Sequence, residues 1–267
     1  MFAAAAVALG FLLLPIVAIF ARVSPAKLVA QLSHPVVTDA LVLSLKTSAI
    51  AQALVVLLGT PAAYLIATRR FPGRSLAVVL VELPLVLPPA VAGIGLIATF
   101  GRFGLLGGTL NAFGIRLGLT QAAVVIAVAY VASPLYVRQA IAAFEAVDPD
   151  LVAASRTLGA GRTRTFFRVV LPLARRGLAA GEALSFARGL GEFGATIMFA
   201  GSLQGVTQTL PLAIYQAFDL QPHGFTTALA MSALLVIVSG ALLVALRLTL
   251  QWQPSRPTSR FLFAPSR

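Results

Sequence analysis

The chain has 267 residues, of which 59% are hydrophobic and 10% are charged, and its mean hydropathy is +0.95. Soluble domains are about 45–50% apolar and about 25% charged, so this composition excludes an ordinary soluble globular protein. The formal net charge is +12. Nucleic acid is not an expected partner, because basic residues accumulate in the cytoplasmic loops of membrane proteins and no basic patch here is interleaved with aromatic residues. The sequence contains no cysteine, which excludes disulfides and thiolate metal sites.

Six apolar segments are long enough to cross about 30 Å of hydrocarbon as helices. They predict an all-α fold, a polytopic transmembrane bundle, with spans at residues 2–20, 43–67, 76–100, 121–143, 178–200 and 226–249. The first segment favours a retained span over a signal peptide, because no Lys or Arg precedes it and its 19 residues exceed the usual apolar core of about 7–15. We expect an N-terminal span and external loop over residues 1–40, a transmembrane domain over 41–250 and a cytoplasmic tail over 251–267.

Basic residues predict how this multi-pass bundle lies in the cytoplasmic (inner) membrane. If both termini are cytoplasmic, thirteen basic residues fall on the cytoplasmic side and four fall outside, which matches the basic character of cytoplasmic loops. The cytoplasmic set is Arg69, Arg70, Arg74, Arg156, Arg162, Arg164, Arg168, Arg175, Arg176, Arg247, Arg256, Arg260 and Arg267, and the external set is Arg22, Lys27, Arg102 and Arg116.

The longest polar insertion, residues 145–177, is predicted to hold a short helix on the cytoplasmic face. Asp148 followed by Pro149 is a helix-start signal, an acidic N-cap with proline at the first helical position. Gly159 and Gly161 are typical of a C-cap and turn. Between them, one weakly apolar stripe recurs at helical spacing, formed by Leu151, Ala154, Ser155 and Leu158. The alternative is a solvated loop whose basic residues reflect only its position on the cytoplasmic side.

This insertion resembles the "EAA" loop of the membrane subunits of bacterial ABC importers. In the string AASRTLGAGRTRTFFRVVLP, Ala153, Ala154 and Ser155 stand at the E-A-A positions, Gly159 is the matching glycine and Leu171-Pro172 closes the pattern. The chain departs from the family at the first position, which is alanine, and at the third, which is serine, so the motif's glutamate is missing. The resemblance implies a coupling loop that docks on an ATPase subunit and includes Asp148, Asp150, Ala153, Ala154, Ser155, Arg156, Leu158, Gly159 and Pro172.

Further strings are similar to oxyanion importers, and to molybdate permeases in particular. They are SLKTS at residues 44–48, FPGRS at 71–75, LPLVLPPAVAG at 83–93, ARGLGEFGATIMFAG at 187–201 and TQTLPLAIY at 207–215. The resemblance implies the type I importer fold and a homodimer with one central path for molybdate, with tungstate as a second substrate. It also implies two cytosolic ATPase subunits that bind ATP and Mg²⁺, and an external substrate-binding protein. The alternatives are a sulfate or thiosulfate permease and an ATP-independent secondary carrier.

Arg188 and Glu192 bring charge into the fifth apolar segment, where burying one charge at the bilayer centre costs about 2.5–3.5 kcal/mol. The two residues are four apart, which places them on one helical face within reach of each other. One interpretation is a charge pair that locks the bundle. The other places them beside the translocation path, where Arg188 would attract an anion and an unpaired Glu192 would repel it.

Glycine and proline predict irregular backbone in two spans. Gly189, Gly191 and Gly194 make a poor straight helix, and Gly177 with Gly181 gives a GxxxG spacing suited to tight helix packing. Prolines remove backbone donors, so the third span is predicted to kink or break at Pro84, Pro88 and Pro89. Such breaks occur where the backbone lines a cavity or packs on protein.

The translocation path or gate is expected to include Lys46, Pro88, Pro89, Arg188, Gly191, Glu192, Gly194 and Thr196. Lys46 has two interpretations: it extends to the membrane interface, or it attracts the anion. No enzyme chemistry is expected, because His34 and His223 lie in separate loops without metal-ligand partners. The chain also lacks a GxxxxGK[ST] phosphate-binding loop and is expected to hold no cofactor itself, so the energy for active transport must come from a partner.

Overall fold

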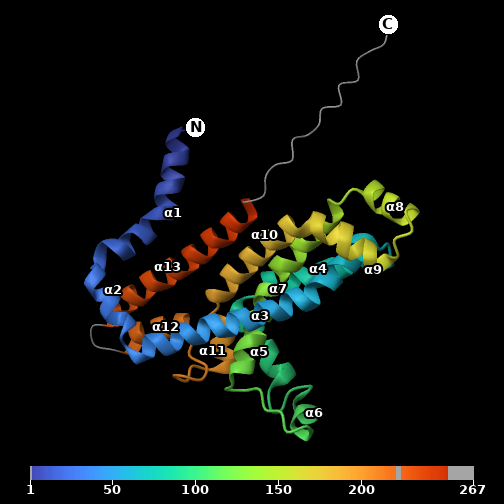
Figure 1. Cartoon of the computed structure of the whole chain (residues 1–267). Helices are drawn as coiled ribbons and strands as arrows, with labels where there is room; N and C mark the ends of the chain where they lie inside the picture. The colour runs from blue at the N-terminus through green and yellow to red at the C-terminus, as the bar shows by residue number, and fades with distance from the viewer. Residues whose placement is uncertain (1, 221–223, 252–267) are drawn as a thin grey trace.

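The computed structural model describes residues 2–220 and 224–251, and all regular structure in these two ranges is helical (Figure 1). The helices are α1 (Phe2–Arg22), α2 (Pro25–Leu32), α3 (Pro35–Thr68), α4 (Arg74–Val86), α5 (Pro89–Phe100), α6 (Gly107–Ala112), α7 (Gln121–Glu145), α8 (Pro149–Thr157), α9 (Arg162–Thr165), the π-helix η1 (Phe166–Val170), α10 (Leu171–Leu190), α11 (Gly194–Ala200), α12 (Leu210–Leu220) and α13 (Gly224–Gln251). The predicted all-α fold is confirmed. The predicted cytoplasmic tail lies almost entirely outside the described residues, as does His223.

Five of the six predicted spans meet a test of length and apolar character. Four are single helices, α1, α3, α7 and α13, and the fifth is the pair α4 and α5, which bends by 113° between Val86 and Pro89. The remaining predicted span, the fifth in chain order at residues 178–200, is divided between α10 and α11. Four charged residues within α10, namely Arg175, Arg176, Glu182 and Arg188, make it the most polar of the long helices. The breaks predicted from proline and glycine are therefore confirmed.

Close packing of α7 against α3 and α10 forms the centre of the bundle. Lipid chains are as apolar as leucine, so helices in a bilayer associate through close contact of small residues rather than through the hydrophobic effect. Gly177 and Gly181 of α10 follow this rule: a Cβ atom on Gly177 would lie 2.5 Å from Cβ of Ala143, and one on Gly181 would lie 2.9 Å from Cβ of Gln139. The predicted GxxxG contact is made with α7.

Helix α1 has no buried residue, and most of its apolar side chains are exposed. In Figure 1 the N-terminal part of α1 projects away from the bundle, and the helix contacts α13. Outward-facing apolar side chains on α3, α4 and α13 add to this surface, as expected for helices that contact lipid.

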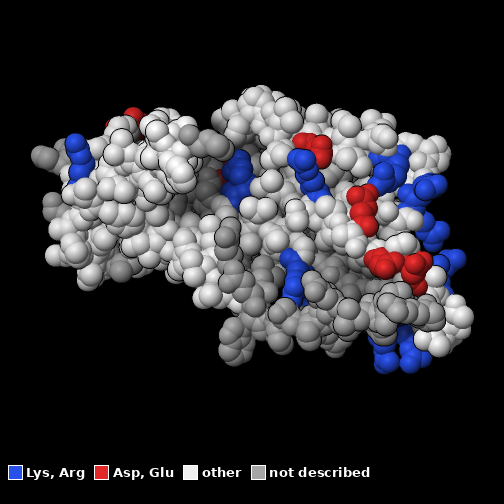
Figure 2. All heavy atoms as spheres, turned by 90° about the horizontal axis from the view of Figure 1, so that it is seen from above, with Lys and Arg blue, Asp and Glu red and all other residues white. Residues whose placement is uncertain are grey.

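Lys and Arg side chains gather at one end of the molecule, over the end that carries α8 and α9 (Figure 2). The helix α12 lies toward the other end (Figure 1). The sequence prediction places the basic end in the cytoplasm, and this orientation remains a prediction.

Candidate functional site

Helix α8 forms where the helix-start signal predicted it. The Asp148 side chain caps the helix, because its Oδ1 accepts a hydrogen bond of 2.8 Å from the backbone N–H of Asp150. At the other end, the N–H of Gly159 donates to the carbonyl of Arg156 and the N–H of Ala160 donates to that of Ser155. These two bonds form a Schellman motif, in which the C′ residue adopts a positive φ that favours glycine. Gly159 is that residue, with a φ of 81°.

Most of the surface of α8 is exposed, although the helix contacts α9 and η1 and its Val152 packs against the core cluster of α7. No residue of the helix is buried, and the Leu158 side chain that follows it is 87% exposed. Ser155 is the exception in the predicted apolar stripe, because its hydroxyl lies 3.2 Å from that of Thr165 and so joins α8 to α9. Leu151 and Ala154 of the same stripe are exposed.

A hollow of about 1020 Å³ opens between α8 and the end of α3. Arginines from α8, α9 and the end of α3 line it, together with aromatic side chains from three elements; among these are Arg69, Arg70, Arg156, Arg162, Tyr64, Phe144 and Phe166. The ring of Tyr64 packs edge-on against Phe166 and Phe144, with centroids 4.7 and 5.3 Å apart. This aromatic contact ties α3 and α7 to η1, a π-helix that sequence periodicity did not predict.

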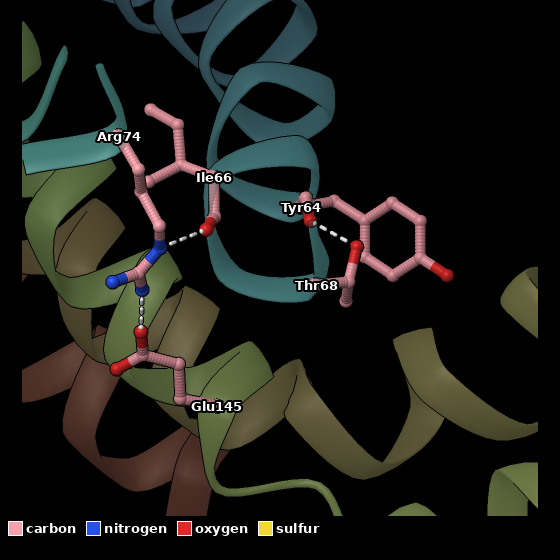
Figure 3. Close-up of polar contacts among 5 residues, drawn as sticks. All are labelled: Tyr64, Ile66, Thr68, Arg74 and Glu145. Carbon is pink, nitrogen blue, oxygen red and sulfur yellow. Dashed lines mark hydrogen bonds and ion pairs between the residues drawn. The ribbon is translucent and has the colours of Figure 1, made fainter. Parts of the chain in front are cut away.

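Arg74 links three helix ends close to α8 (Figure 3). Its Nε donates a hydrogen bond of 2.8 Å to the carbonyl of Ile66 near the end of α3, and its Nη2 forms an ion pair with Glu145 at the end of α7. Sequence reasoning missed this pairing because 71 residues separate the two charges. Glu145 lies three residues before Asp148, so the link fixes the segment from which α8 begins.

The charge pair predicted in the fifth span is formed. Arg188 Nη1 lies 2.8 Å from Glu192 Oε2, and the Glu192 side chain is 1% exposed while that of Arg188 is 33% exposed. The other carboxylate oxygen, Oε1, accepts a hydrogen bond of 2.8 Å from the backbone N–H of Ala195. Glu192 therefore caps α11 in addition to pairing with Arg188, a role that the spacing did not reveal.

The two helix breaks pack against each other. A Cβ atom on Gly194, the first residue of α11, would lie 2.5 Å from Cβ of Pro89, the first residue of α5. Farther along the same pair of helices, a Cβ on Gly93 would lie 2.6 Å from Cβ of Met198. The backbones of α5 and α11 can approach this closely only because glycine stands at both positions.

The structure brings several predicted path residues together at this contact. Pro88 caps α5, Gly191 caps α10, and Thr196 is fully buried in α11. Lys46, a further predicted path residue, contacts the start of α7, where its Nζ donates a hydrogen bond of 2.9 Å to Gln121 Oε1. Within the described residues, no group of three or more His, Asp or Glu side chains is placed to hold a metal ion.

A family model described as "Binding-protein-dependent transport system inner membrane component" matches residues 55–249. The chain is 45% identical to the molybdenum transport system permease protein ModB of Mycobacterium tuberculosis over 86% of each chain. It is 42% identical to ModB of Escherichia coli over 80% of this chain and 92% of that protein. Among solved structures, a bacterial alginate ABC transporter in complex with its pentasaccharide-bound periplasmic protein has a TM-score of 0.72 at 15% identity, covering 91% of this chain and 89% of that one. The structural likeness shows a shared fold, that of the type I permeases of ABC importers.

The Arg188–Glu192 pair predicts a graded effect on stability. Glu192→Gln keeps an oxygen that can accept from Ala195 but leaves Arg188 unpaired, so it should lower the free energy of unfolding by about 1.5–3 kcal/mol. Glu192→Ala removes both contacts and should cost more. Thermal unfolding of the purified protein in detergent measures both. The double change Arg188→Gln with Glu192→Gln is the control and should recover part of the loss; if Glu192→Gln leaves stability unchanged but abolishes transport, the pair is not a lock.

Arg74 is expected to stabilise the helix ends more than an ordinary surface ion pair does. Arg74→Gln removes a charge-assisted hydrogen bond and an ion pair and should lower the free energy of unfolding by about 1.5–3 kcal/mol. Arg138→Gln is the matched control, because Arg138 makes only a 3.4 Å ion pair with Glu82 and should cost about 0.2–1 kcal/mol. Equal losses in denaturant titrations of the two variants would contradict the linking role of Arg74.

Proposed function

Because the chain belongs to the family of binding-protein-dependent transport system inner membrane components, we propose that it is the membrane-spanning permease subunit of an ATP-driven importer for molybdate, with tungstate as a second substrate. The observation that carries the choice of substrate is the identity of 42–45% to two proteins named as molybdenum transport permeases, over at least 80% of this chain. Molybdate and tungstate are dianions of nearly equal size and shape, so a path that admits one admits the other.

The exposed helix α8 is proposed as the contact with a cytosolic ATPase subunit. The helix is capped at both ends and joined to α9 by the contact between the Ser155 and Thr165 hydroxyls, so another protein can push or pull on it as a unit. The arginines that line the hollow beside α8 favour a partner surface with carboxylate side chains. ATP and Mg²⁺ would be bound by that partner, because this chain has no phosphate-binding loop.

Two copies of the chain are proposed to enclose one central path, with two ATPase subunits inside and a substrate-binding protein outside. Closure of the ATPase subunits on ATP would draw the two α8 helices together. This movement would turn the path from inward-facing to outward-facing, and hydrolysis would reset it. The paired helix breaks at Pro89 and Gly194 are the proposed place of the gate, because backbone that is not regular helix is tolerated in a membrane only where protein covers it or it lines a cavity.

Two alternative functions predict different features of the protein. A sulfate or thiosulfate permease would share the fold and the docking helix and would differ in the oxyanion carried. A secondary carrier would need no docking helix, so the exposed and independently capped α8 argues against it.

Stimulated ATP hydrolysis tests the proposed function. In proteoliposomes that hold this chain with its ATPase and binding protein, molybdate and tungstate should raise the rate of ATP hydrolysis, while sulfate at the same concentration should leave it at the basal rate. Stimulation by sulfate alone would assign the chain to the sulfate alternative. If no ATPase subunit co-purifies with it, the secondary carrier becomes the better assignment.

Gly159 provides a matched pair of variants for the role of α8. Gly159→Val places a branched side chain at a φ of 81°, which costs about 1–2 kcal/mol and should unwind the end of α8. Gly161→Val introduces the same side chain at a φ of −66°, with no atom within 4 Å of the new Cβ, and should be tolerated. Transport-coupled ATP hydrolysis should fall in the first variant only, with the unfolding temperature of the bundle unchanged in both. Equal activity of the two variants would show that the shape of α8 does not matter.

A further inference from the structure

A group of buried polar atoms near the helix breaks has no hydrogen-bond partner. Among the residues that the structure describes, six buried side-chain oxygen atoms have no hydrogen-bond partner. One of them, Glu192 Oε2, is ion-paired with Arg188, and four of the others come from residues 196–209. The four are Thr196 Oγ1, Ser202 Oγ, Gln208 Oε1 and Thr209 Oγ1, which we call the polar seam. A buried polar atom without a partner costs free energy, so four of them within one stretch of chain call for an explanation.

A general lack of hydrogen-bond partners in this region does not explain the seam, because nearby hydroxyl groups do form hydrogen bonds. The hydroxyl of Thr207 accepts a hydrogen bond of 2.9 Å from the N–H of Leu203 in the same loop. The hydroxyl of Ser44 on α3 accepts one of 2.7 Å from the N–H of Leu210. The fold therefore pairs the hydroxyls of Thr207 and Ser44 but leaves the polar atoms of the seam without a hydrogen-bond partner.

The seam lies beside the charged break between α10 and α11. Thr196 is in α11, and Gln208 and Thr209 immediately precede α12. The rings of Phe193 and Tyr215, 5.2 Å apart, bring α12 back against the break at which Arg188 and Glu192 pair. In Figure 1, α11 and α12 lie away from the end of the bundle that carries α8.

We propose that the polar seam lines the path of the transported oxyanion at its outer side and is closed in this conformation; this inference rests on the proposed function for its cargo. The three hydroxyls can each donate a hydrogen bond to an oxygen of a tetrahedral dianion, and Gln208 Oε1 can accept one from a water that travels with it. Neutral donors suit a path better than arginines do, because the anion must leave as readily as it enters.

The closed state explains why these atoms are unpartnered. Thr196, Gln208 and Thr209 are 0%, 5% and 4% exposed, so neither water nor an anion reaches them as the helices are now packed. Separating the walls of the seam would give each atom a partner, whereas separating apolar walls would expose hydrocarbon to water. The seam therefore lowers the cost of opening at the point where the anion must pass.

Isosteric substitutions distinguish a lining role from a structural one. Thr196→Val and Thr209→Val remove an unpartnered hydroxyl with little change of shape, so each should lower molybdate uptake by roughly tenfold while the unfolding temperature stays the same or rises. Thr207→Val is the matched control in the same loop: it leaves the N–H of Leu203 without its acceptor and should lower the unfolding temperature. Unchanged uptake in both seam variants, or a loss of uptake matched by a loss of stability, would overturn the proposal.

Cysteine labelling tests the opening directly, because the natural chain contains no cysteine. In the complete complex, Ser202→Cys and Thr209→Cys should react quickly with a small anionic methanethiosulfonate during ATP turnover and slowly without ATP. Added molybdate should slow the reaction during turnover. Val128→Cys, in the core of α7, is the control that should stay unlabelled. Equal labelling with and without ATP, or none in either state, would contradict a seam that opens.

The choice of anion separates failure of this inference from failure of the proposed function. If the unaltered transporter carries sulfate but not molybdate, the proposed substrate is wrong, and the same variants are then measured with sulfate. If the transporter carries the anion normally in both valine variants, the substrate assignment stands and the seam is not part of the path.

Discussion

Backbone groups inside a bilayer have no water to bond with, so every interruption of a helix must be satisfied by protein. This chain interrupts two neighbouring spans and packs the interruptions together, with Gly194 against Pro89. Glu192 makes the second break possible, because its carboxylate accepts from the N–H of Ala195 at the start of α11 while Arg188 offsets its charge. A residue that looks out of place in an apolar sequence is thus the acceptor that lets a new helix begin inside the bundle.

The rest of the bundle connects this region to α8. Helix α7 packs against α3 and α10 along its length and also contacts α4 and α11, so it touches both broken spans. Its last residue, Glu145, is held by Arg74 at the start of α4, and α8 begins four residues later. The contacts between the exposed helix and the breaks are therefore continuous. Because the glycine contacts are close-packed, a movement at one end is transmitted to the other with little loss.

Features encoded within one turn of helix could be predicted from the sequence, and those that depend on distant partners could not. The cap at Asp148, the C-cap at Gly159, the proline break and the pairing of Arg188 with Glu192 all follow from residues at most four apart. Helix α12, the π-helix η1, the Arg74–Glu145 link and the unpartnered Thr209 hydroxyl depend on contacts across the bundle. Hydropathy alone marks residues 76–100 and 178–200 as single apolar spans, because it records apolar character but not where a helix bends; the breaks were predicted from proline and glycine.

Charge near the path has to satisfy two opposed needs. A dianion crossing hydrocarbon requires stabilisation, yet a strong site of full positive charge would hold it and stop transport. Arg188 supplies positive charge whose field is largely offset by a buried carboxylate 2.8 Å away, so an anion nearby meets a dipole rather than a free cation. Stabilisation by hydroxyl groups that become available only on opening complements such a dipole, because it is weak for each contact and vanishes when the path closes. Together, these two features would favour passage of an anion over its retention.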